Sequence, residues 1–133
     1  MAITAIDHIA MTVANVEATV AWYERVLDAE PLYLDLWRRG EIPVVMLQVG
    51  EGRISIHPAA APGEPTARVP TVGSADVCFR WRGPISGAIA VLADNGVAME
   101  QGPVDRPASN GVFGQSIYFR DPDGNLLELL SID

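Results

Sequence analysis

The sequence has very little cysteine, no cluster of basic residues and no long apolar run. Its single cysteine, Cys78, excludes an internal disulfide and fits a reducing cytoplasm. The formal net charge of −8 at pH 7, without clustered lysine or arginine, argues against a nucleic-acid surface and against binding to an anionic membrane. The N-terminus lacks a basic region followed by a long apolar run, so we expect neither a signal peptide nor a membrane span. We therefore expect a soluble cytoplasmic protein, for which a small neutral or cationic ligand is the easiest to accommodate.

The first half of the chain alternates between strand and helix patterns. With 133 residues, of which 49 % are hydrophobic, the chain is long enough for one domain with a real core. Asn15 suits the N-cap of a helix, since apolar residues then recur at helical spacing until Pro31 blocks any continuation. The strand patterns cover residues 6–13, 32–38, 43–49 and 53–57, and the last two runs are joined by a hairpin turn at 50–52.

The second half repeats this order after a proline-rich crossover at residues 59–74. A helix is predicted after Pro84 and ends at Asn95-Gly96, and residues 102–114 are predicted to be a loop that serves either as a lid or as plain surface. The strand patterns here cover residues 76–82, 97–101, 115–120 and 126–131. The chain therefore predicts an α+β fold: two tandem βαβββ modules, 5–58 and 75–133, form an open, incomplete barrel within a single domain over residues 1–133.

One carboxylate stands in an apolar run near the end of the chain. The segment 121–125, Asp-Pro-Asp-Gly-Asn, predicts a tight turn, because Pro122 presets φ and Gly124 accepts a positive φ. In the strand that follows, Glu128 is flanked by leucines, where a carboxylate is costly to desolvate unless it is paired or binds a metal. An arginine such as Arg80 is the alternative partner to a metal ion.

Strand alternation places several polar residues on the sheet faces that the helices leave free. In each strand the apolar positions are expected to pack against the helix, so the intervening positions line a concave inner face. The polar members of this inner set are His8, Ser55, His57, Asp76, Cys78, Arg80 and Glu128. Two imidazoles and a carboxylate with open positions are typical of a non-haem iron site and are common ligands for other divalent metals.

Each of these residues also has a simpler interpretation. A histidine before proline, as His57 is, often only ends a strand, and His8 could be a histidine whose hydrogen bonds are satisfied within the sheet. Cys78 fits a small apolar filler. By parity Trp37, Tyr118 and Arg80 could line a substrate pocket, although each could equally serve sheet packing.

At these positions the sequence resembles a known superfamily. The resemblance rests on Ile6-Asp7-His8-Ile9, on residues 54–58, on residues 73–79 and above all on residues 116–128, which contain the Asp-Pro-Asp-Gly-Asn turn before an apolar strand with glutamate. These segments resemble the vicinal oxygen chelate superfamily, which includes glyoxalase I, extradiol dioxygenases, methylmalonyl-CoA epimerase, fosfomycin-resistance proteins and bleomycin-binding proteins. More narrowly, they resemble glyoxalase-domain proteins labelled dioxygenase-like or virulence-related.

The resemblance implies a metal site and a class of chemistry. It implies that His8, His57 and Glu128 bind a divalent ion (Fe, Mn, Ni, Co or Zn), with Glu128 as a catalytic base. Asp76 stands where the superfamily usually has a histidine or glutamate ligand, so it would ligate the ion or orient a histidine. The implied function is glyoxalase-like lyase or isomerase chemistry, or ring-cleaving dioxygenase chemistry, on a small substrate with vicinal oxygens. A metal-free binding protein for a bleomycin-like antibiotic is the alternative, and a homodimer is implied in either case.

Overall fold

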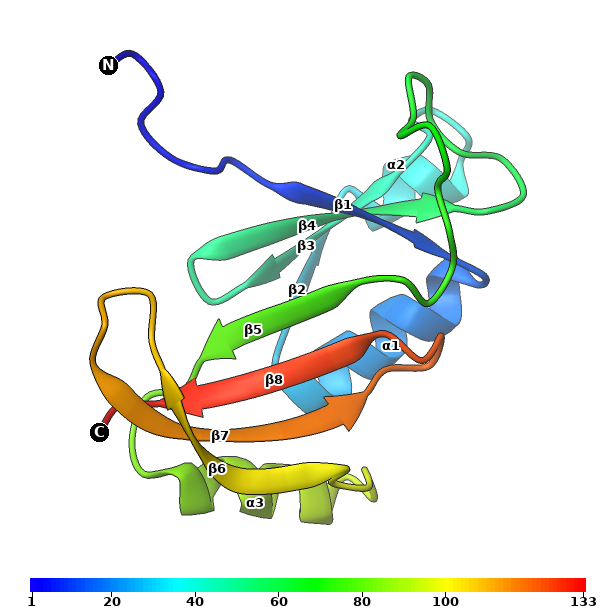
Figure 1. The fold of residues 1–133 in the computed structure, drawn as a ribbon. Coiled ribbons are helices and arrows are strands. Elements are labelled where there is room, and N and C mark those ends of the chain that lie inside the picture. Colours follow the sequence, from blue (N-terminus) through cyan, green and yellow to red (C-terminus); the bar gives the residue numbers. More distant parts are fainter. The chain divides into compact units, whose positions relative to one another are not determined.

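The structure, a computed structural model, describes residues 1–133 and divides them into two compact units, Met1–Gly73 and Ser74–Asp133. Each unit has one four-stranded sheet, with the strand orders β1-β4-β3-β2 and β5-β8-β7-β6 (Figure 1). The predicted repeat of βαβββ modules is confirmed, and the first unit carries one additional short helix. None of the helices is both long and apolar enough to span a membrane. Whether the two units act as one domain stays a prediction.

The first unit is built on a sheet in which β1 and β4 are parallel and the other pairings are antiparallel. Its elements are β1 (Ile9–Val13), α1 (Val16–Leu27), β2 (Glu30–Leu32), α2 (Leu34–Arg38), β3 (Val45–Val49) and β4 (Gly52–Pro58). Asn15 caps α1 as predicted, since its side-chain oxygen accepts a hydrogen bond from the Ala18 amide at 2.9 Å. β1 begins at Ile9 and not at Ile6, because Ile9 is the first residue that pairs with β4.

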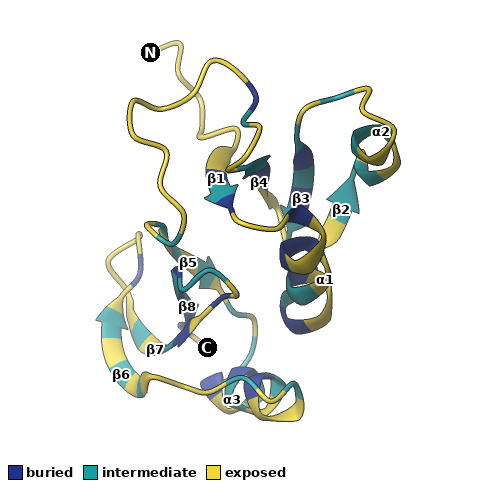
Figure 2. Ribbon diagram, turned by 90° about the vertical axis from the view of Figure 1, so that its right-hand side faces the viewer, coloured by how far each residue is buried: buried dark blue, intermediate teal, exposed yellow.

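The core of the first unit lies between α1 and one face of its sheet. Met11, Ile56 and Val45 occupy one cross-strand row and are almost fully buried. The Tyr23 hydroxyl on α1 reaches the Met11 sulfur at 3.7 Å, which identifies this face as the one that the helix covers. The dark blue positions of α1 in Figure 2 are the residues buried in this contact. The apolar side of each strand thus packs against the helix, as the alternation predicted.

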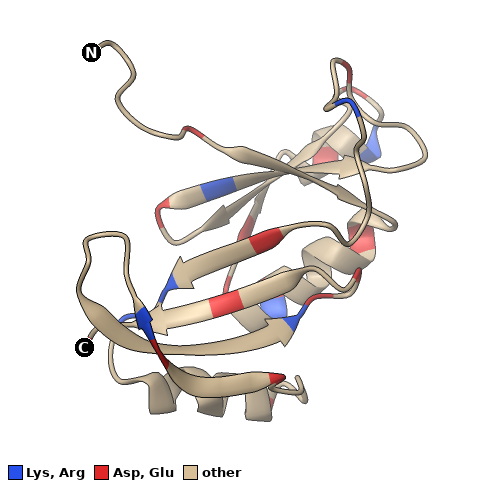
Figure 3. Cartoon of the chain, in the orientation of Figure 1, with Lys and Arg blue, Asp and Glu red and all other residues tan.

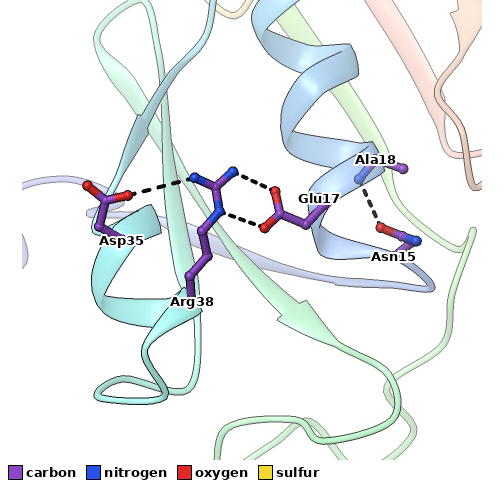
Figure 4. Close-up of polar contacts among 5 residues, drawn as sticks. All are labelled: Asn15, Glu17, Ala18, Asp35 and Arg38. Carbon is purple, nitrogen blue, oxygen red and sulfur yellow. Dashed lines mark hydrogen bonds and ion pairs between the residues drawn. The ribbon is translucent and has the colours of Figure 1, made fainter.

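The strand predicted at residues 32–38 is wrong: β2 ends at Leu32 and residues 34–38 form the helix α2. Tyr33 adopts a left-handed conformation, with φ of 68°, which breaks the extended chain. Arg38 at the end of α2 donates two hydrogen bonds to the Glu17 carboxylate of α1, at 2.7 and 2.8 Å, and lies 3.7 Å from Asp35 (Figure 4). This bidentate ion pair between α2 and α1 is a contact that the local sequence pattern cannot report.

The second unit has a single helix against its sheet. Its elements are β5 (Asp76–Arg80), α3 (Ile85–Asp94), β6 (Gln101–Pro107), β7 (Phe113–Arg120) and β8 (Leu126–Ser131). Ala88 and Leu92 of α3 are fully buried, and α3 packs against β7 and β8. Asn95 and Gly96 end the helix as predicted, and Gly96 has a positive φ of 67°.

The strand predicted at 97–101 and the loop predicted at 102–114 are both wrong, because β6 runs from Gln101 to Pro107 and pairs with β7. Pro103 and Pro107 are compatible with a strand here because β6 is an edge strand, where proline is tolerated. Gly114 lies inside β7, where a side chain would overlap the carbonyl oxygen of Ser131 on β8. The loop is thus reduced to residues 108–112, too short for the lid considered at 102–114.

The turn between β7 and β8 is held by a hydrogen-bonded clasp formed by Asp121, Asn125 and Ala75. The Asp121 carboxylate accepts hydrogen bonds from the amides of Asp123 and Asn125 at 2.9 and 3.0 Å, and from the Asn125 side chain at 2.8 Å. The Asn125 side-chain oxygen accepts from the Ala75 amide at 2.8 Å, and the Leu126 amide donates to the Ala75 carbonyl at 3.0 Å. Asp121 and Asn125 are 6 % and 1 % exposed. The clasp therefore ties the start of β8 to the start of β5.

We expect Asn125→Ala to lower the free energy of unfolding by about 2–4 kcal/mol, because it removes two buried hydrogen bonds and leaves the Ala75 amide unpaired. The matched control is Asn110→Ala in the exposed 108–112 turn, where one exposed hydrogen bond to the Val112 amide is lost and the expected change is below about 1 kcal/mol. Urea denaturation measures both variants. Equal losses would show that the clasp adds no more than an ordinary turn.

Candidate metal and substrate site

The predicted ligands of the second unit lie on the face of its sheet opposite the apolar core. Glu128 of β8 is paired in register with Cys78 of β5 and with Tyr118 of β7, so these three residues share one cross-strand row. Leu127 and Leu129, the neighbours of Glu128 in sequence, are buried on the other face. Figure 3 shows acidic positions on the adjacent strands β5 and β8, and Asp76 is the one on β5.

The spacing between Asp76 and Glu128 follows from the register. Asp76 is paired with Leu126, two residues before Glu128, so the Cα atoms of the two acidic residues are about 8 Å apart. Arg120, in the same row as Asp76, is held by a bidentate ion pair with Glu100 at 3.0 and 3.1 Å. The Asp76 carboxylate makes no hydrogen bond or ion pair of its own within this unit, which leaves its oxygens available to a ligand.

A cavity of about 340 Å³ opens beside Glu128. Its strand walls are formed by Cys78, Arg80, Glu128 and Leu130, and its remaining wall by residues 107–109 after β6. Hydrogen bonds within the turn hold that wall: the Ala108 amide donates to the Val112 carbonyl at 2.8 Å, and the Gly111 amide donates to the Ala108 carbonyl at 2.8 Å. The turn that forms this wall is therefore held by its own backbone hydrogen bonds.

Glu128 is not neutralised by an arginine. Arg80 lines the same cavity, but no hydrogen bond and no ion pair within 4.0 Å joins its guanidinium to Glu128. The neighbour that contacts Glu128 is Cys78. Although Cys78 as a whole residue is exposed, partial burial of its thiol, the negative charge of Glu128 and a hydrogen bond to Glu128 raise the pKa of Cys78 to about 12. The thiol is thus protonated at neutral pH, and it donates to the Phe79 carbonyl oxygen at 3.9 Å beside the Glu128 carboxylate.

The two histidines lie on one face of the first unit, at different heights along its strands. His57 is paired with Thr12, four residues beyond His8, so strand geometry separates the Cα atoms of the two histidines by roughly 14 Å. Partial burial, followed by the charge of His8, lowers the pKa of His57. His57 is therefore neutral at pH 7, the form in which imidazole binds metals.

His8 is already held by a carboxylate. Its Nδ1 lies 2.7 Å from the Asp7 carboxylate, and this contact lowers the pKa of Asp7. When Nδ1 carries the proton, Nε2 keeps its lone pair free, which is the arrangement commonly found in histidine ligands of metals. Asp7 was not among the predicted site residues, although its position next to His8 was the available signal.

The predicted pocket residues Tyr118 and Trp37 have different surroundings. The Tyr118 hydroxyl accepts a hydrogen bond from Arg106 Nε at 3.0 Å, and the Arg106 guanidinium carbon lies 5.7 Å from the centroid of the Tyr118 ring. Arg106 was missed because it falls in the segment predicted as a loop. Trp37 lies on α2 and lines a separate cavity of the first unit beside Arg38, so the strand-parity argument for Trp37 is wrong.

Within neither unit do three histidine, cysteine, aspartate or glutamate side chains come close enough together to hold a metal ion. The predicted set draws His8 and His57 from the first unit and Asp76 and Glu128 from the second. The shared metal site therefore stays a prediction.

Known proteins resemble this chain over nearly its whole length. The model of the Glyoxalase/Bleomycin resistance protein/Dioxygenase superfamily matches residues 5–129. Virulence protein STM3117 of Salmonella typhimurium is 36 % identical over 129 residues, which cover 97 % of this chain and 85 % of that protein. Glyoxalase domain-containing protein RDO1 of Mycosarcoma maydis is 33 % identical over 131 residues, which cover 98 % of this chain and 70 % of that protein.

Solved structures agree with these sequence matches. The crystal structure of STM3117 has a TM-score of 0.89 and 34 % sequence identity, with all of both chains covered. Lactoylglutathione lyase from Agrobacterium tumefaciens has a TM-score of 0.70 at 21 % identity, covering 98 % of this chain and 96 % of its own. A mutant of the fosfomycin resistance protein FosX from Listeria monocytogenes, complexed with Mn(II) and 1S,2S-dihydroxypropylphosphonic acid, has a TM-score of 0.62 at 22 % identity, covering 96 % and 90 %. The last two show the fold alone, whereas the family model and the closer relatives establish that this chain belongs to the glyoxalase/bleomycin resistance protein/dioxygenase superfamily.

Proposed function

We propose that this chain is a divalent-metal-dependent enzyme of the glyoxalase/dioxygenase type, acting on a small substrate with vicinal oxygens. The observation that carries the proposal is the state of Glu128, a carboxylate in a cavity that lacks an arginine partner and contacts a neutral thiol. A carboxylate in this state is available as a metal ligand and as a base.

The proposed ligands are His8, His57 and Glu128, with Asp76 either ligating the ion or orienting a histidine. The chemistry of these donors fits a divalent metal. Asp7 leaves Nε2 of His8 free, the lowered pKa of His57 keeps that ring neutral, and Glu128 is unpaired with any cation. Histidine and carboxylate together suit Fe, Mn, Ni, Co and Zn, so the donors do not select one metal.

The metal would supply positive charge that stabilises negative charge developing on two neighbouring substrate oxygens. Glu128 is proposed to remove the substrate proton, and the cavity beside it is proposed to hold the rest of a small molecule. Lyase and isomerase reactions need only this arrangement, whereas a ring-cleaving dioxygenase also needs redox-active iron. FosX and lactoylglutathione lyase share the fold, and the FosX mutant is complexed with Mn(II).

Metal binding is tested on protein purified without a histidine tag, by elemental analysis and by thermal unfolding with Fe²⁺, Mn²⁺, Ni²⁺, Co²⁺ or Zn²⁺. We expect one of these ions to bind stoichiometrically and to stabilise the protein by about 2.7 kcal/mol at a hundredfold excess over its Kd. His8→Ala and Glu128→Gln should abolish the stabilisation, and parallel His57→Ala and Asp76→Asn variants identify the remaining ligand.

The matched control is Glu51→Gln in the turn between β3 and β4, which should keep full metal binding. If the wild-type protein carries none of the five ions and is stabilised by none of them, the proposal of a metal-dependent enzyme is contradicted. The metal-free antibiotic-binding function would then be the one to pursue, with bleomycin as the ligand to titrate.

The rate at which Cys78 is alkylated tests whether Glu128 places a negative charge beside the thiol. Because its pKa is raised to about 12, we expect metal-free wild-type protein to react with iodoacetamide at pH 8 about a hundredfold or more slower than an unperturbed cysteine. Glu128→Gln removes the negative charge that disfavours the thiolate, so the pKa should fall and the reaction should accelerate. Glu100→Gln, at the Arg120 ion pair, should leave the rate unchanged. An unaltered rate in Glu128→Gln would show that Glu128 carries no charge beside the thiol.

We also propose that the protein is a homodimer, because each sheet ends in two edge strands, β1 and β2 or β5 and β6, and edge strands are usually covered. Light scattering at micromolar concentration should give twice the chain mass of 14.3 kDa. A mass near that of one chain would contradict this proposal and leave the metal proposal untouched.

A further inference from the structure

Arg80 lines the second unit's cavity and has no partner, unlike Arg106 and Arg120 elsewhere on the same sheet. Arg120 is neutralised by Glu100, and Arg106 donates to the Tyr118 hydroxyl and to the Asp105 carbonyl. The Arg80 guanidinium forms no hydrogen bond and no ion pair, although it lines the cavity. Guanidinium groups carry their charge at every physiological pH, so the cavity holds a permanent, unmatched cation.

Arg80 and Glu128 are diagonal neighbours on one face of the sheet, and no ion pair joins them. Arg80 is paired with Leu130, two residues after Glu128, so the Cα atoms of Arg80 and Glu128 are about 8 Å apart on one face. The apolar side chain of Leu130 and the neutral thiol of Cys78 line the cavity with them. One cavity wall thus presents a cation and an anion at separate positions.

A second polar group in the row of Arg80 is also unmet. Ser116 of β7 is paired with Leu130, and its hydroxyl is fully buried without a hydrogen-bond partner. Ser109, on the opposite wall of the cavity, adds another hydroxyl that makes no hydrogen bond within the protein. The cavity therefore presents the Arg80 guanidinium and the Ser109 hydroxyl as donors and Glu128 as an acceptor, whereas Ser116 shares the row of Arg80 but does not line the cavity.

We propose that Arg80 binds an oxyanion of the ligand, a carboxylate or a phosphonate, while the reacting part of the same ligand lies at Glu128. A planar guanidinium pairs with such groups through two parallel hydrogen bonds, which also fixes the orientation of the ligand. The inference rests on the function proposed above and specifies its substrate class as anionic. It departs from the expectation of a neutral or cationic ligand, which followed from the net charge of −8, because the charge at one wall of a cavity is set by its own residues.

The test uses metal-free full-length protein, so that its outcome does not depend on the metal site. Lactate, methylphosphonate and the neutral analogue lactamide are titrated at constant ionic strength, and binding is followed by amide chemical shifts. We expect one or both anions to bind saturably with shifts in residues 78–80 and 107–109, and lactamide to bind at least about tenfold more weakly, a difference of about 1.4 kcal/mol. Preference for lactate identifies a carboxylate ligand, and preference for methylphosphonate a phosphonate.

Arg80→Gln should weaken anion binding about tenfold or more. The affinity of Arg80→Lys should lie between those of Arg80→Gln and the wild type, because lysine keeps the positive charge but lacks the two parallel N–H donors of the guanidinium. Arg82→Gln is the matched control, because Arg82 follows β5 and does not line the cavity. Anion binding that survives in Arg80→Gln, or an absence of binding by both anions to the wild type, would overturn the proposal. Neither result would bear on metal binding, which is measured separately on His8→Ala and Glu128→Gln.

Discussion

The clasp formed by Asp121, Asn125 and Ala75 is the constraint on which the second unit's site depends. It fixes the start of β8 against the start of β5, and Glu128 follows only three residues after Asn125. A shift of one residue in this pairing would turn Glu128 toward α3 and expose Leu127 or Leu129 in its place. The buried hydrogen bonds of the clasp oppose such a shift. The segment that most strongly marks the superfamily in the sequence thus fixes the position of the Glu128 carboxylate.

The faces of the strands could be predicted from the sequence, whereas some elements could not. Alternation with one buried side is a direct record of which residues meet a helix, and the burial of Met11, Ile56 and Leu127 agrees with it. The helix α2 was missed because Leu32, Leu34 and Leu36 alternate as a strand would, and the left-handed turn at Tyr33 leaves no mark in the pattern. The strand β6 was missed because its prolines are acceptable only at a sheet edge, and a strand's place in the sheet is a tertiary property.

The site shows the same division between local and tertiary information. Alternation tells which face a side chain occupies but not its height along a neighbouring strand, so the offset between His8 and His57 became known only from the pairing of His57 with Thr12. The absence of an Arg80–Glu128 ion pair likewise became known only from the structure, since the two residues are diagonal neighbours that long side chains could join. The contact of Arg106 with Tyr118 required the position of β6. Sequence reasoning therefore selected the residues on each face, and the strand pairings decide which of them can act together.

The separation of Arg80 from Glu128 has an energetic consequence for any ligand. Two opposite charges in contact would satisfy each other, and a ligand would then have to break their interaction before binding to either one. Because no ion pair joins Arg80 to Glu128 in the cavity, each charge keeps its capacity to bind a ligand. A molecule that reaches both positions displaces water from both and gains two oriented charge-assisted interactions. The register of β5 against β8, set by the clasp, thus determines the spacing of Arg80 and Glu128 that the proposed ligand would span.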